Sequence, residues 1–234
     1  MIPKVIHYCW FGHNKKPSYV RKCIETWHQY CPDYTFKEWN EDNYDLSSSP
    51  FVKEAYDAKK WAFVTDYVRL DVIEKYGGIY LDTDVKLIKP LNALLSDSCF
   101  VAVDEGGINT GIGFGAMPHH WMIKRMLAQY QDKHFMIDGK MDMTPCNLIT
   151  TPLFEHLGYD PHNSSTQHIR DVTIYAKDYF DPLDGATSEM CQSEHTIGIH
   201  LKSGSWTDRK THLKSRIRIA LGDAFIAKLK KLFS

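Results

Sequence analysis

Hydrophobic residues follow two alternating patterns along this chain. Short hydrophobic runs predict strands at 4–11, 34–39, 79–81, 85–88, 99–103, 172–175 and 196–200. Hydrophobic positions at helical spacing predict helices over 17–30, 51–76 and 119–131, and we expect the second of these to break near Lys59. Strands that alternate with helices are typical of a layered α/β domain.

Glycines and polar residues separate these elements. Gly12 follows the first hydrophobic run, and Gly77 and Gly78 follow the long helical segment. Glycine often ends a helix because it adopts left-handed backbone angles without a steric clash. The polar segment 40–50 predicts a loop, and a glycine-rich stretch follows the strand predicted at 99–103.

The C-terminal segment differs from the rest of the chain. From Asp208 to Ser234 it holds eight Lys or Arg residues and two Asp residues. Its hydrophobic residues step mainly by four along one helical face, namely Leu213, Ile217, Leu221, Phe225, Leu229 and Leu232. Two interpretations stay open: a terminal helix packed on the domain, or a basic amphipathic helix on an anionic membrane surface.

The composition narrows the class of protein. A chain of 234 residues with 43% hydrophobic residues has the usual size and core content of one domain. The net charge of -1 provides no general attraction to nucleic acid, so we expect no nucleic-acid partner. The six cysteines form no C-x-x-C pair, which argues against a zinc site or a disulfide framework. Without a signal-peptide pattern, the predicted location is the cytoplasm, with the tail as a peripheral contact to the inner face of the membrane.

Asp82 and Asp84 are the first candidates for chemistry. They directly follow the strand predicted at 79–81, where ligands commonly bind in an open α/β sheet. Two carboxylates spaced by one residue can face the same point. Mg²⁺ and Mn²⁺ prefer such oxygen ligands and also bind diphosphate oxygens. An Asp-x-Asp triplet alone is common in solvated turns, so the surrounding sequence has to support this interpretation.

Asp66 and Arg69 supply that support. They lie three residues apart, on one face of the predicted helix, within a largely hydrophobic segment. A surface ion pair at this spacing would add little stability. Charged residues inside a hydrophobic segment are more typical of the lining of a cleft.

Residues 62–69 and 76–84 together resemble the signature A-x-x-(S/T)-D-x-x-R … Y-G-G-x-Y-x-D-x-D of glycosyltransferase family 32. Residues 2–10 resemble the opening strand of that family, and residues 200–206 resemble its closing H-x(4)-S-W motif. The family includes bacterial capsular and exopolysaccharide transferases. The resemblance implies a GT-A fold, with a Rossmann-like nucleotide-binding mixed sheet flanked by helices. It covers residues 1–206, which predicts a catalytic domain there and a separate tail at 207–234.

The resemblance also implies roles for the charged residues. Asp82 and Asp84 would hold Mn²⁺ or Mg²⁺, and His200 would complete the metal or diphosphate site. Asp66 and Arg69 would hold the donor sugar, with Arg69 also placed to meet phosphate charge. The alternative for His200 is a strand-end histidine that only satisfies hydrogen bonds within the fold.

Five further residues receive roles from the same resemblance. Trp10 would stack on the nucleotide base, and Tyr80 and Asn109 would line the donor pocket. Ser205 and Trp206 would close over the diphosphate. Trp10 as an ordinary core residue and Asn109 as a simple turn residue remain the alternatives.

The function implied is that of a metal-dependent, retaining hexosyltransferase. Its donor would be a nucleotide sugar, with UDP-hexose favoured, and its acceptor a saccharide or lipid-linked saccharide in bacterial capsule, exopolysaccharide or lipopolysaccharide synthesis. One alternative is a haloacid-dehalogenase-like phosphatase, because residues 82–84 match the D-x-D part of its D-x-D-x-(T/V) motif, which normally lies on the first strand of that fold. A non-catalytic carbohydrate-binding homologue is the other alternative.

Overall fold

A seven-stranded mixed sheet forms the centre of the computed structural model, which describes residues 1–184, 189–204 and 219. In spatial order its strands are β2 (Thr35–Trp39), β1 (Val5–Cys9), β3 (Gly78–Tyr80), β6 (Gly107–Ala116), β5 (Cys99–Asp104), β10 (Val172–Tyr175) and β9 (Gln167–Ile169). Strand β1 runs parallel to both of its neighbours, whereas β6 runs antiparallel to β3 and β5. The predicted α/β class is confirmed.

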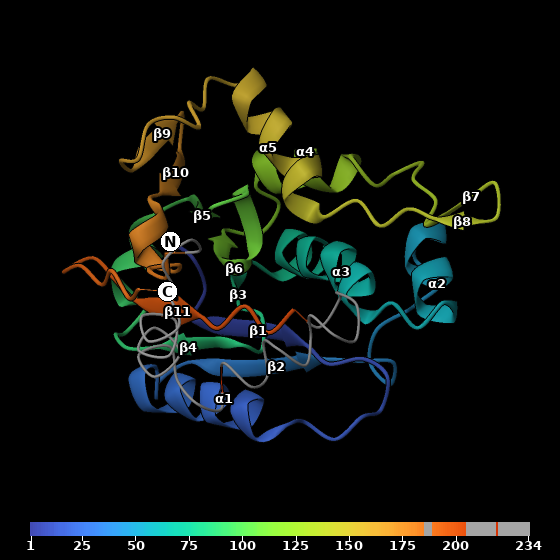
Figure 1. The fold of residues 1–234 in the computed structure, drawn as a ribbon, viewed down its shortest axis with the longest axis horizontal. Coiled ribbons are helices and arrows are strands. Elements are labelled where there is room, and N and C mark those ends of the chain that lie inside the picture. The colour runs from blue at the N-terminus through green and yellow to red at the C-terminus, as the bar shows by residue number, and fades with distance from the viewer. Residues whose placement is uncertain (185–188, 205–218, 220–234) are drawn as a thin grey trace, which may run out of the picture.

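Two small sheets accompany the large one. Strand β11 (Gly198–His200) pairs antiparallel with β4 (Val85–Leu87), and β7 (Met136–Ile137) forms a hairpin with β8 (Lys140–Met141). The helices are α1 (Ser18–Tyr30), α2 (Pro50–Asp57), α3 (Trp61–Tyr76), α4 (Trp121–Ala128) and α5 (Cys146–His156), with short 3₁₀ helices η1 (Asn92–Ser96) and η2 (Lys177–Tyr179). Helix α1 lies on one side of the sheet and α3 on the other (Figure 1).

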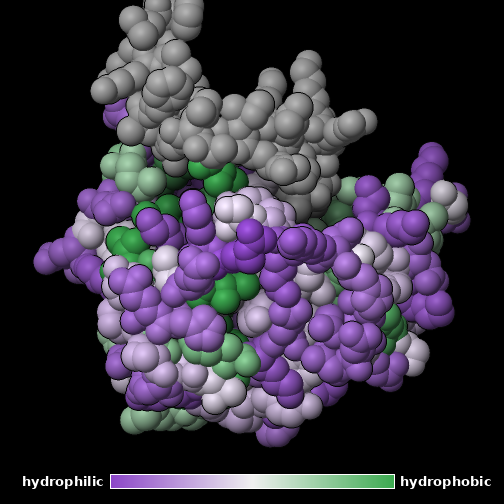
Figure 2. All heavy atoms as spheres, turned by 90° about the horizontal axis from the view of Figure 1, so that it is seen from below, coloured by the Kyte–Doolittle hydropathy of each residue, from purple (hydrophilic) through white to green (hydrophobic). Residues whose placement is uncertain are grey.

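Each face of the sheet carries its own hydrophobic core. One core joins the sheet to α2, α3 and α4, with Val64, Val68, Val101, Phe114 and Ile123 among its members. The other includes Ile6, Trp27, Ile79, Leu87 and Phe100 and lies on the side of α1. Phe100 and Val101 enter opposite cores because successive side chains of a strand point to opposite faces. On the face drawn in Figure 2, polar residues predominate and hydrophobic groups show only in small separate areas.

Most predicted elements are present, and many are shorter or shifted by a residue. The break near Lys59 is confirmed, since α2 and α3 are separate helices and Lys59 has a left-handed φ of 57°. The glycine-rich stretch is β6, the central antiparallel strand. Gly115 is needed there because a side-chain carbon would lie 2.8 Å from the carbonyl oxygen of Gly78. Helix α5 and strand β9 were not predicted.

Two predictions concern residues that the structure does not describe. The closing residues Ser205 and Trp206 lie outside the described residues. So does the tail at 207–234, apart from Ile219. Within the described ranges, no helix is long and hydrophobic enough to cross a membrane.

His7 links three elements of the fold. Its Nδ1 accepts a hydrogen bond of 3.0 Å from the indole N–H of Trp39, and its Nε2–H donates to the carbonyl oxygen of Gly77 at 2.9 Å. Because an indole nitrogen can only donate, this arrangement requires a neutral imidazole. Burial lowers the pKa of His7 to about 4.

We expect this histidine to make the fold sensitive to acid. An unfolded histidine has a pKa near ~6.5, so the unfolded chain binds more protons than the folded one between ~6.5 and ~4. The free energy of unfolding should therefore fall by about 2 kcal/mol from this site between about pH 7 and pH 5. Urea unfolding at both pH values checks this for the wild type and His7→Gln. An equal loss in the two proteins would contradict the assignment.

Candidate active site

A cavity of about 700 Å³ opens at the carboxyl ends of β1 and β3. Helix α3, strand β6, the start of α5 and residues 200–204 complete its wall. The predicted site residues within the described part of the chain all line it: Trp10, Asp66, Arg69, Tyr80, Asp82, Asp84, Asn109 and His200. Residues far apart in the sequence are therefore gathered in one cleft.

A buried ion pair forms one wall of the cleft. Arg69 is only 3% exposed, and its Nη2 lies 2.5 Å from Oδ1 of Asp66, one turn earlier in α3. Its Nη1 lies 3.8 Å from Oδ1 of Asp82, and within the described residues its Nε has no hydrogen-bond partner. Burial raises the pKa of Asp66 to about 6 although the neighbouring guanidinium acts in the opposite direction. The prediction that this pair lines a cleft is confirmed.

Asp82 is held by residues of β3 and β6. Its Oδ1 accepts a hydrogen bond of 2.9 Å from the hydroxyl of Tyr80, and its backbone N–H donates to the carbonyl oxygen of Gly111 at 2.8 Å. Gly111 leaves space for this carboxylate, because a side-chain carbon there would lie 2.1 Å from Oδ2 of Asp82. Burial raises the pKa of Asp82, and the negative charge of Asp84 adds to that rise.

Asp84 contacts the segment that follows β11. Its Oδ2 accepts a hydrogen bond of 2.9 Å from the backbone N–H of Ser203, and its Oδ1 lies 3.6 Å from Nε2 of His200. The antiparallel pairing of β4 with β11 produces this contact, since it places His200 opposite Val85. Burial alone would raise the pKa of Asp84, but His200 and Ser203 hold it below its ordinary value.

The two carboxylates are suited to a divalent cation without forming a closed metal site. In the described part of the chain, no group of three or more His, Cys, Asp or Glu side chains is arranged to enclose a metal ion. Asp84 and His200 are in contact, whereas Asp82 is turned toward Tyr80 and Arg69. A cation bound by both carboxylates would relieve the repulsion that raises the pKa of Asp82. Hard oxygen donors are also what Mg²⁺ and Mn²⁺ prefer.

Trp10 and Asn109 both line the cleft and both make contacts within the fold. The indole N–H of Trp10 donates to the carbonyl oxygen of Asn14 at 2.6 Å, and the indole is only partly buried. The side-chain amide of Asn109 donates to Asp104 at 2.6 Å, and its Oδ1 accepts from the backbone N–H of Gly111 at 2.8 Å. Trp10 is therefore not an ordinary core residue. Asn109 lies in strand β6 and is not a simple turn residue, although its side chain also links Asp104 to Gly111.

Cys146 is a cleft residue that the sequence patterns did not indicate. It begins α5, lines the cleft and hydrogen-bonds Asp66 through its thiol. Burial raises the pKa of this thiol to about 12, so it stays protonated and can donate to the carboxylate. A single cysteine carries no periodic signal, and Pro152 inside α5 obscured the helix around it.

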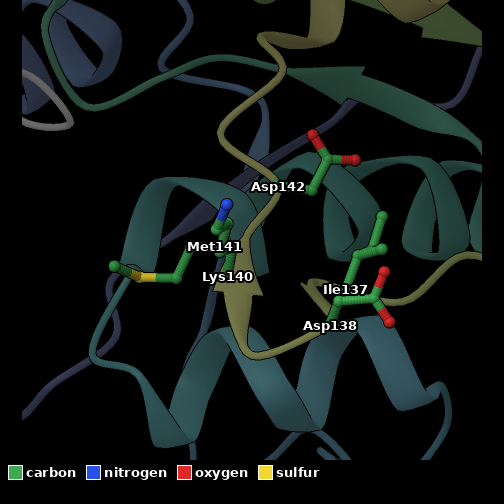
Figure 3. Close-up of a pocket in the computed structure, with 5 residues that line it drawn as sticks. All are labelled: Ile137, Asp138, Lys140, Met141 and Asp142. Atoms are coloured by element: carbon green, nitrogen blue, oxygen red, sulfur yellow. The ribbon is translucent and has the colours of Figure 1, made fainter.

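A second hollow, of about 410 Å³, lies at the β7–β8 hairpin. It is lined by Ile137, Asp138, Lys140, Met141 and Asp142, all within or next to that hairpin (Figure 3). The carboxylates of Asp138 and Asp142 lie apart, and none of the predicted site residues is there. The larger cleft is therefore the candidate active site.

Residues 17–101 match the family described as "Glycosyltransferase sugar-binding region containing DXD motif". The chain is 28% identical over 131 residues to inositol phosphoceramide mannosyltransferase 3 of Schizosaccharomyces pombe, which is 53% of this chain and 36% of that relative. It is 27% identical over 236 residues to an uncharacterized glycosyltransferase of Acanthamoeba polyphaga mimivirus, which is 92% of this chain and 86% of that one. The chain thus spans just over a third of the length of the yeast relative.

A solved structure shares the fold. It is a glycosyltransferase involved in the glycosylation of the major capsid of PBCV-1, with a TM-score of 0.52 and 17% identity over 92% of this chain and 100% of that chain. The predicted GT-A fold is confirmed. The matched region contains the charged cleft residues Asp66, Arg69, Asp82 and Asp84. The chain therefore has a GT-A fold and, over residues 17–101, is similar to the DXD-containing sugar-binding region of glycosyltransferases.

Proposed function

We propose that this protein transfers a sugar from a nucleotide-sugar donor to a saccharide acceptor, with a divalent cation at Asp82 and Asp84. One observation carries the proposal. A single cleft brings both carboxylates of the DXD motif next to the buried Asp66–Arg69 pair. Residues 17–101 match a family described as a sugar-binding region, which supports a sugar as the ligand of this cleft.

The lining of the cleft suits both the nucleobase and the diphosphate-sugar part of such a donor. Aromatic side chains from the segment after β1, from α1 and from the start of α3 line the cleft, namely Trp10, Phe11, Tyr19, Trp61 and Phe63. A flat nucleobase can stack on such rings. The cleft lining also includes the four charged residues described above together with His200. Diphosphate and sugar hydroxyl groups need charged and hydrogen-bonding partners of this kind.

The reaction breaks the bond between the anomeric carbon and a phosphate oxygen, and the nucleoside diphosphate leaves with the bonding electrons. The acceptor hydroxyl oxygen forms the new bond, and its proton passes to an oxygen of the leaving phosphate. When bound, the cation would supply positive charge to the leaving diphosphate. Arg69 contributes charge at the same end, and Asp66 and Asp82 orient sugar hydroxyl groups by accepting their hydrogen bonds.

The finer parts of the proposal follow from the resemblance to family 32. They are a UDP-hexose donor, Mn²⁺ or Mg²⁺, retention of the anomeric configuration and a saccharide or lipid-linked acceptor in bacterial capsule, exopolysaccharide or lipopolysaccharide synthesis. A cytoplasmic location, with contact to the inner membrane face through residues 207–234, belongs to the same proposal. The inositol phosphoceramide mannosyltransferases among the relatives keep a mannose donor in consideration.

The phosphatase alternative receives less support. Its motif would make Asp82 the nucleophile on the first strand, whereas Asp82 follows β3, the third strand along the chain. The carboxylate of Asp82 is also occupied by Tyr80 and Arg69.

A panel of nucleotide sugars tests the proposal. Slow hydrolysis of one donor is expected with Mn²⁺ and not with EDTA, and UDP with Mn²⁺ should raise the melting temperature more than either does alone. Release of phosphate from a generic phosphate ester would favour the phosphatase instead. Sugar binding without any nucleotide binding would favour the non-catalytic homologue.

Gly111→Ala should lower donor hydrolysis by about tenfold to a hundredfold. The new methyl group would overlap Oδ2 of Asp82 and lie 3.2 Å from Nη1 of Arg69, so the carboxylate must move. Gly111 does not have a left-handed φ, so backbone strain is not the cause. Gly139→Ala, outside the cleft, is the control for the rate: nothing lies within 4 Å of the added carbon, and the left-handed φ of 75° should cost stability without lowering donor hydrolysis. If Gly111→Ala hydrolysed the donor at the wild-type rate, the absence of a side chain at Gly111 would not be needed to position Asp82.

A further inference from the structure

Glu41 ties together three segments that meet behind the aromatic end of the cleft. Its Oε1 accepts a hydrogen bond of 2.8 Å from the backbone N–H of Gly12 and one of 3.1 Å from the hydroxyl of Tyr56. The same oxygen lies 3.3 Å from Nε2 of His13. The side chain of Glu41 is 7% exposed, so these contacts are largely screened from water.

These contacts fix an unusual turn after β1. Gly12 has a φ of 92° and His13 a φ of 53°, both in the left-handed region. Gly12 also lies flat against Trp61, because a side-chain carbon would come within 2.6 Å of its indole ring. The turn is therefore held between the carboxylate of Glu41 and the ring of Trp61.

This turn presents part of the cleft wall. Trp10 precedes it, and the indole N–H of Trp10 donates to the carbonyl oxygen of Asn14 on its far side. Trp10, Asn14 and Trp61 all line the cleft, whereas Glu41 does not. A shift of the turn would move Trp10 and Asn14 while leaving the carboxylates of the DXD motif in place, since β3 and α3 position those.

We propose that Glu41 is a positioning residue for the nucleobase end of the donor site, acting through the turn at residues 10–14. This inference rests on the proposed function. Glu41 receives backbone and hydroxyl hydrogen bonds that hold Trp10 in its stacking position. It thereby sets affinity for the nucleoside part of the donor and not for the diphosphate.

The charge state of Glu41 agrees with this role. Burial alone would raise the pKa of its carboxyl. The backbone N–H groups of Glu41 and Gly12 and the hydroxyl of Tyr56 outweigh that effect and hold the pKa below its ordinary value. Removal of the carboxylate would leave the N–H of Gly12 and the hydroxyl of Tyr56 without their acceptor.

Calorimetric titration with Mn²⁺ present separates the two ends of the site. UDP and GDP are titrated into the wild type, and the tighter one is compared with inorganic pyrophosphate, which lacks the nucleoside. Glu41→Ala should weaken nucleoside diphosphate binding about fivefold or more, while pyrophosphate affinity should change less than about twofold. Glu41→Gln keeps an oxygen acceptor and should restore most of the nucleotide affinity.

Glu54→Ala is the matched control. Glu54 also accepts from a backbone N–H and a histidine, at Met136 and His134, but lies outside the cleft. This variant should lose stability without losing nucleotide affinity. Should Glu41→Ala fold poorly, Gly12→Ala disturbs the same turn from the Trp61 side and should give the same selective loss.

Three outcomes would overturn the inference. They are unchanged nucleotide binding in Glu41→Ala, an equal loss for pyrophosphate, or an equal loss in Glu54→Ala. Failure of the wild type to bind either nucleoside diphosphate would instead overturn the proposed function, and this inference with it.

Discussion

Replacing Asp84 by asparagine should lower the rate of sugar transfer about a hundredfold or more, while the protein stays folded. Asparagine keeps an oxygen that can accept the hydrogen bond from the backbone N–H of Ser203, so residues 200–204 should remain in place. The negative charge that would hold the cation beside His200 is lost. Charge stabilisation of the leaving group is usually the largest contribution to such a reaction.

Donor hydrolysis and the melting temperature, measured on the same preparation, check this prediction. Asp33→Asn is the matched control, because Asp33 is an exposed aspartate that pairs with Lys4 away from the cleft. Its rate should equal that of the wild type. If Asp84→Asn worked at a near wild-type rate, the assignment of Asp84 to the metal would fail.

Arg69→Ala should lower both the stability of the fold and the rate of sugar transfer. Arg69 is buried beside Asp66, and its removal would leave that carboxylate without a positive partner. Breaking a buried ion pair from one side typically costs about 3–5 kcal/mol. The rate should also fall by about a hundredfold, since the guanidinium lies at the charged end of the cleft beside Asp82.

A double variant separates the two effects. In Arg69→Ala/Asp66→Asn the unpaired charge is gone, so much of the lost free energy of unfolding should return while activity stays low. Urea unfolding of the wild type, both single variants and the double variant measures the coupling. A double variant as unstable as Arg69→Ala would mean that the instability arises from lost packing and not from the uncompensated carboxylate.

The sequence by itself predicted the elements that local patterns define. Hydrophobic runs located β1, β2, β3 and β5, and helical spacing located α1, α3 and α4. The sequence also predicted the break between α2 and α3, because the helical pattern over 51–76 is interrupted near Lys59. Motif spacing identified the cleft residues, since Asp66 and Arg69 share a helix face and Asp82 and Asp84 follow a strand.

The tertiary structure decided which residues meet. Asp84 and Ser203 lie 119 positions apart, and only the pairing of β4 with β11 brings them into contact. Gly111 makes room for Asp82, Cys146 donates to Asp66, and Glu41 holds the turn after β1. A local pattern records the face that a side chain presents. It does not predict which residue that side chain contacts across a cleft. Such a contact forms only when distant strands pair and both hydrophobic cores pack against the sheet.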